Sequence, residues 1–80
     1  MRINLEQPVK MLRDYLQDID DQIFKLNEVI MRDLKAANRR GDGALADLEY
    51  CSVMSCVEEI AGLEIQESRI RKALAYLTED

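Results

Sequence analysis

The sequence predicts an all-α protein: an antiparallel hairpin of two long helices that dimerises into a four-helix bundle. Two observations predict the hairpin, the scarcity of helix breakers and a single cluster of turn residues near the middle of the chain. The 80 residues include only one Pro and three Gly, while 48% are hydrophobic and 34% are charged. A chain of this length forms one domain at most. We therefore expect residues 1–80 to be a single helical-hairpin domain.

The turn is expected at residues 40–43. Gly41 suits the left-handed position that follows a helix, and Asp42 suits the N-cap of the next helix. Lys35 and Arg39 complement the negative end of the first helix, since cations are favourable near a helix C-terminus. A connection this short makes the two helices antiparallel neighbours.

The first helix is expected over about residues 8–39, with residues 1–6 as an N-terminal arm. Pro8 favours this start because Pro is best tolerated in the first turn. A cap formed by Asn4 is the alternative, and it is less favoured because it would place Pro8 where its missing N–H matters. Apolar residues then recur at steps of three and four, which is a near-heptad seam. The seam comprises Leu12, Leu16, Ile19, Ile23, Leu26, Ile30, Leu34 and Ala37.

The second helix, expected over about residues 43–78, carries two apolar stripes. One comprises Leu45, Val53, Cys56, Ile60, Leu63, Ile70, Leu74 and Leu77. The other comprises Tyr50, Met54, Val57, Ala61, Ile65 and Tyr76. The stripe centres lie roughly 150° apart, too wide for packing against one helix. We expect the second stripe to be an oligomer interface, most simply of a dimer, because soluble monomers rarely expose so large an apolar patch. The alternative is that a different protein covers it.

No pattern in the sequence predicts catalysis. The chain contains no His, the commonest general base and metal ligand. The acidic pairs Asp18-x-x-Asp21 and Glu64-x-x-Glu67 are spaced as in some magnesium sites of helical proteins. However, Asp18 and Asp21 project away from the seam, whereas Glu67 projects toward it. We therefore expect no enzyme activity, catalytic residues, metal or cofactor, and keep a small-ligand or magnesium-dependent nucleotide site at an oligomer interface as a second alternative.

Charge and cysteine usage indicate the setting. The formal net charge of −5 argues against direct nucleic-acid binding. No apolar run approaches the length of a membrane span, and the first residues lack the core of a signal peptide. Cys51 and Cys56 are five positions apart, which on one helix separates them by roughly 140°, so we expect no disulfide between them. We expect both to be free thiols that fill apolar space. A cytoplasmic protein without membrane contact is the expectation.

An acidic face on the first helix is the most uneven surface feature. We expect it to comprise Asp14, Asp18, Asp21 and Glu28, opposite the seam. The favoured function is a non-enzymatic, acidic protein–protein interaction module or adaptor that binds itself and an unidentified protein. By analogy with small acidic proteins of phages and mobile elements, the alternative is an inhibitor whose acidic face occupies a nucleic-acid-binding or partner site of a host protein.

Overall fold

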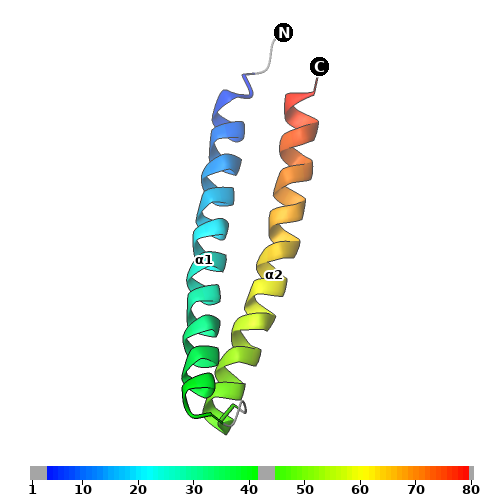
Figure 1. Cartoon of the computed structure of the whole chain (residues 1–80). Coiled ribbons are helices and arrows are strands. Elements are labelled where there is room, and N and C mark those ends of the chain that lie inside the picture. Colours follow the sequence, from blue (N-terminus) through cyan, green and yellow to red (C-terminus); the bar gives the residue numbers. More distant parts are fainter. Residues whose placement is uncertain (1–3, 42–44, 80) are drawn as a thin grey trace.

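The structure, a computed structural model, describes residues 4–41 and 45–79 and confirms the predicted antiparallel hairpin of two helices. Helix α1 spans Glu6–Arg39 and helix α2 spans Asp47–Thr78. The helices lie side by side, with the two chain termini at the same end of the molecule (Figure 1). The radius of gyration is 18.2 Å, whereas a compact domain of this length would have about 12 Å. The molecule is a rod of 66 × 17 × 14 Å.

Helix α1 begins two residues earlier than predicted, and the reason corrects the argument about Pro8. The N-cap is Leu5, which has no side-chain acceptor, and the Glu6 backbone N–H donates to Asn4 Oδ1 at 2.9 Å, so Asn4 satisfies the first free N–H of the helix from the position before the cap. The Val9 N–H then donates to the Leu5 carbonyl at 3.0 Å, the first bond of the helical ladder. Pro8 precedes that bond, so its missing N–H removes no helical hydrogen bond. Residues 1–3 of the predicted arm lie outside the described residues.

The turn is longer than predicted. Gly41 follows α1 with φ of +83°, as expected for the left-handed residue that ends a helix. Helix α2 begins at Asp47 rather than at residue 43, and Ala46 is its N-cap. The Glu49 side chain accepts the Ala46 N–H at 2.9 Å, which is one half of a capping box. The predicted cap at Asp42 lies outside the described residues.

The seam between the helices is more regular than predicted. On α1 the predicted seam residues are buried or half-buried, except that Leu34 is 43% exposed, and Asp33 takes its place at 9%. Asp33 lies seven residues after Leu26, so it continues the heptad spacing that Leu34 would break. On α2 the predicted residues of the first stripe are buried or half-buried, and Leu45, which precedes the helix, is half-buried too.

The hairpin encloses little core. Among the described residues, the buried hydrophobic side chains are those of Ile19, Ala37 and Cys56, and no large side chain is fully buried. Two helices in contact leave the other sides of each helix open to solvent, so apolar residues of α2 that lie off the seam, such as Tyr50 and Ile65, are exposed.

Candidate functional site

Five exposed apolar residues of α2 form one stripe along the turn half of the helix. They are the predicted interface residues Tyr50, Met54, Val57, Ala61 and Ile65. Their spacing of four, three, four and four residues keeps them on one face of α2. Tyr50 and Ile65 are each 56% exposed. The stripe is thus present in the hairpin and uncovered.

Tyr76 was predicted as part of the same interface, but it lies apart. It is 80% exposed and follows Ile65 by eleven residues, roughly 16 Å along the helix axis. Its role in an interface stays a prediction.

Grooves along the hairpin establish which helix faces share a side. One groove is lined by Gln22 of α1 with Glu59 and Gln66 of α2, so these residues mark one long side. Another groove joins the seam residue Ile23 to Glu64 and Ser68 on the opposite long side. Val57 precedes Glu64 by seven residues and therefore lies on that opposite side, with the rest of the stripe.

Helix α1 adds three exposed apolar residues to the same side. Leu34 directly follows the seam residue Asp33, and Val57 directly follows the seam residue Cys56. In an antiparallel helix pair, the residues that come directly after these seam positions lie on the same side of the seam. Phe24 and Met31 lie on the surface of α1, on the same side of the seam as Leu34, and are 63% and 50% exposed. We call the eight residues the apolar side of the hairpin. They are Phe24, Met31, Leu34, Tyr50, Met54, Val57, Ala61 and Ile65.

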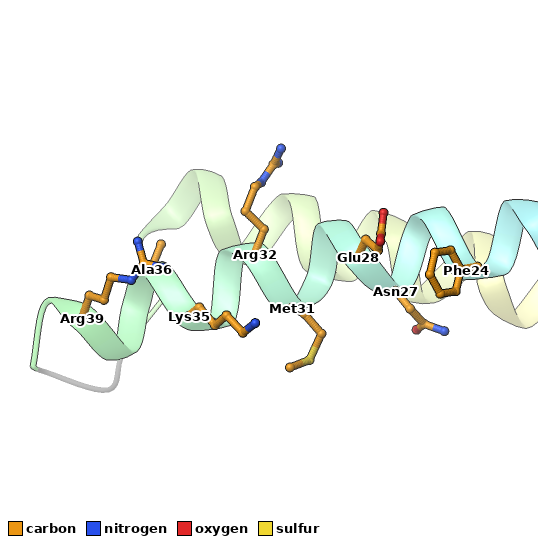
Figure 2. Close-up of a pocket in the computed structure, with 8 residues that line it drawn as sticks. All are labelled: Phe24, Asn27, Glu28, Met31, Arg32, Lys35, Ala36 and Arg39. Carbon is orange, nitrogen blue, oxygen red and sulfur yellow. The ribbon is translucent and has the colours of Figure 1, made fainter.

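The surface of α1 beside the apolar side is open. Figure 2 shows a shallow groove whose lining residues all belong to α1, including the exposed side chains of Phe24 and Met31. Arg32, Lys35 and Arg39 extend from the same stretch of helix. The groove therefore combines apolar surface with positive charge and is not an enclosed cavity.

The predicted acidic face lies on α1, away from the seam. Asp14, Asp18, Asp21 and Glu28 are all exposed. Asp21 accepts a hydrogen bond from the Gln17 side chain at 3.1 Å. Within residues 4–41 and 45–79, none of the four carboxylates forms an ion pair. The face is accessible, and its role in binding stays a prediction.

An ion pair closes the seam at the turn. Arg40 donates to both carboxylate oxygens of Glu49, at 2.8 Å and 2.5 Å. The hydrogen bonds from Arg40 and from the Ala46 N–H lower the pKa of Glu49 from 4.5 to about 2. No partner of Glu49 was predicted from the sequence; the pair joins the end of α1 to the first turn of α2.

Two further carboxylates lie in the seam. Asp33 has one oxygen, Oδ2, that is buried without a hydrogen-bond partner among the described residues. At the open end of the hairpin, an acid at Glu67 could reach water or pair with Arg13 or Lys10 of α1; in the structure its carboxylate lies 3.4 Å from Arg71 Nε, one turn farther along α2. A contact within α2 takes the place of a contact between helices.

The described residues hold no group of three or more carboxylates and thiols that could bind a metal ion. Glu67 is half-buried at the seam, while Asp18 and Asp21 are exposed on the far side of α1, so the two acidic pairs stay apart. Both cysteines are free, as predicted; Cys56 is buried, but Cys51 is exposed and fills no apolar space.

Comparison with known proteins assigns no family. No protein-family model, curated protein or solved structure matches the chain. In the described part of the chain, neither helix has a stretch long and apolar enough to cross a membrane.

Proposed function

We propose that the protein is a non-enzymatic protein–protein interaction module that works as a helical homo-oligomer, most simply a dimer of hairpins. The observation that carries the proposal is the apolar side. The exposed surface of its eight side chains adds up to roughly 600 Å², taking about 200 Å² as the surface of a whole aromatic residue. That is at the upper limit of the largest apolar patch on a typical monomer, about 300–600 Å².

The area also suits a stable interface. Specific interfaces bury about 800 Å² on each partner, and polar residues around the apolar side would supply the remainder. Covering the exposed part of each large side chain contributes about 1.5–3 kcal/mol. Association through this side therefore provides the apolar burial that the two-helix seam lacks.

A matched pair of tyrosine variants tests the proposal. Tyr50→Glu places a charge in the apolar side, whereas Tyr76→Glu makes the same change at an exposed tyrosine outside it. Sedimentation equilibrium should show a dimer for the wild-type chain. We expect Tyr50→Glu to weaken it at least about tenfold, because both copies lose the buried ring, and Tyr76→Glu to leave it unchanged.

A monomer at micromolar concentration would contradict the proposal. Equal effects of the two substitutions would instead show that the interface is elsewhere. Circular dichroism of both variants should retain the helical signal, which separates loss of association from loss of folding.

The acidic face supports a second candidate function, an inhibitor that binds a basic surface of another protein. Its four carboxylates are exposed without an ion pair among the described residues, and three of them, Asp14, Asp18 and Asp21, lie outside the groove that contains Phe24 and Met31. Replacing Asp14, Asp18 and Asp21 by Lys should abolish capture of such a partner from a lysate, while the wild-type complex should weaken steeply with salt. Capture that survives both treatments would show that the face is only a solvated surface.

A further inference from the structure

The apolar side covers only the turn half of the hairpin. Its residues span 24–34 on α1 and 50–65 on α2. Toward the open end the same side becomes polar, where Arg13, Glu64, Ser68 and Arg71 are exposed. A partner that covers the apolar surface therefore engages the turn half and leaves the open end free.

The stripe on α2 can pair with the same stripe of a second copy that is related to it by a two-fold rotation near Val57 and therefore runs antiparallel. Tyr50 precedes Val57 by seven residues, and Ile65 follows it by eight. Reversal therefore brings Tyr50 opposite Ile65, and it brings the large Met54 opposite the small Ala61. On α1 the same rotation brings Phe24 opposite Leu34. Met54 and Ala61 form a large–small pair, and the other two pairs place apolar side chains against each other, so all three would bury apolar surface.

Charge distinguishes the two symmetric ways of pairing hairpins. The middle of the rod is an acidic belt, with five acidic residues in 14–28 and four in 58–67 against one lysine, Lys25. At the turn end, Arg32, Lys35, Arg39 and Arg40 balance the nearby carboxylates. A parallel dimer, with both turns at one end, brings the two belts level with each other, so that the carboxylates that border the apolar side, such as Glu28 and Glu64, face like charges and repel. An antiparallel dimer places the belt of each copy against the turn half of the other.

We infer that the occupant of the apolar side is a second copy of this chain in the antiparallel orientation, with α1 against the partner's α1 and α2 against the partner's α2. The two-fold axis passes close to Val57. This inference rests on the proposed self-association and adds the relative orientation of the two hairpins. Asp14, Asp18 and Asp21 are not part of the apolar side, whereas Glu28 lines the groove beside Phe24 and Met31, so the antiparallel dimer presents two sets of these three aspartates.

Cysteine cross-linking tests the orientation, with Cys51→Ser as the background because Cys51 is exposed. In the antiparallel dimer Val57 lies near the axis and meets the partner's Val57. We expect Val57→Cys alone to shift most of the chain to the disulfide-linked dimer on mild oxidation. A mixture of the Tyr50→Cys and Ile65→Cys chains should also cross-link. Tyr76→Cys, exposed but outside the apolar side, is the matched control and should stay monomeric on a non-reducing gel.

The outcomes separate the inference from the proposal beneath it. A parallel dimer would bring Val57 opposite Met31 of α1, so a mixture of Val57→Cys and Met31→Cys chains would cross-link while Val57→Cys alone would not. That result would overturn the orientation and keep the dimer. If no pair cross-links and the background chain sediments as a monomer, both fall. Helical circular dichroism of each variant, measured under reducing conditions, ensures that folded chains are compared.

Discussion

Replacing Asp33 by leucine should stabilise the hairpin. Asp33 is 9% exposed, and its Oδ2 atom is buried without a hydrogen-bond partner among the described residues. The nearest cation is Arg32, whose Nε lies 3.6 Å from the other oxygen, Oδ1. The Arg32 side chain is 72% exposed, so water screens this pair. The carboxyl group thus occupies a seam position with little to offset its desolvation.

The expected magnitude follows from these contacts. Removing a buried, unsatisfied acceptor relieves about 1–3 kcal/mol. Loss of the screened pair with Arg32 costs about 0–1 kcal/mol. A leucine at this heptad position adds apolar burial of about 1.5–3 kcal/mol, which overpacking offsets by about 1–3 kcal/mol. We therefore expect Asp33→Leu to raise the free energy of unfolding by about 1–3 kcal/mol.

Urea titration followed by far-ultraviolet circular dichroism, at one fixed protein concentration, measures this change as a higher midpoint with an unchanged slope. Asp33→Asn keeps a polar group of the same shape and should change stability little. Asp18→Leu makes the leucine substitution at an exposed aspartate of the same helix and should stay within about 0.5 kcal/mol of the wild type. Destabilisation by Asp33→Leu would refute the reasoning, since it would mean that the carboxyl group contributes to the seam.

Three further results are expected. Because the pKa of Glu49 is lowered from 4.5 to about 2, the unfolded chain takes up the proton first; stability should fall as the pH falls from about 4.5 toward 2, and acid titration of Glu49→Gln should lack this part of the slope. Gly41→Ala should lower the free energy of unfolding by about 1–2 kcal/mol, because φ is +83° there. Gly62→Ala, inside α2 with open space around it, should raise the free energy of unfolding by about 0.5–1 kcal/mol. A higher melting temperature for Gly41→Ala than for Gly62→Ala would contradict the assigned conformations. The melting temperature of the wild-type chain should rise with protein concentration, since a dimer couples folding to association, and a constant value would contradict the dimer.

Periodicity predicted the architecture well because the seam repeats over many turns. The two stripes of α2 were separable from sequence alone, and their burial and exposure follow the prediction, from half-buried Leu45 to exposed Ile65. The error on α1 came from ranking residue type above spacing. Leu34 was preferred as the more apolar residue, although Asp33 lies at the heptad position that follows Leu26. Helix geometry decides which residue faces the partner, even when that residue is a carboxylate.

The ends of the helices were predicted less well because capping depends on local geometry that spacing does not reveal. Helix α2 begins at Asp47; its N-cap, Ala46, has no side-chain acceptor, and Glu49 supplies the capping bond from the third helical position. The Ala46–Glu49 spacing lacks the Ser or Thr that makes a capping box recognisable in sequence. The contact between Arg40 and Glu49 also spans the turn, so the residue pattern of α1 alone or of α2 alone does not reveal it.

The distribution of polar and apolar residues between the seam and the apolar side is the one that the proposed dimer requires of each hairpin. Asp33, Glu49 and Glu67 occupy seam positions that a self-sufficient hairpin would fill with apolar residues. Meanwhile Phe24 and Tyr50, among the largest side chains of the molecule, are more than half exposed. Buried carboxylates in a helical seam contribute little to stability but can restrict register. The seam then sets how α1 and α2 align, and covering the apolar side supplies the burial that stabilises the fold, so association and folding would be parts of one process.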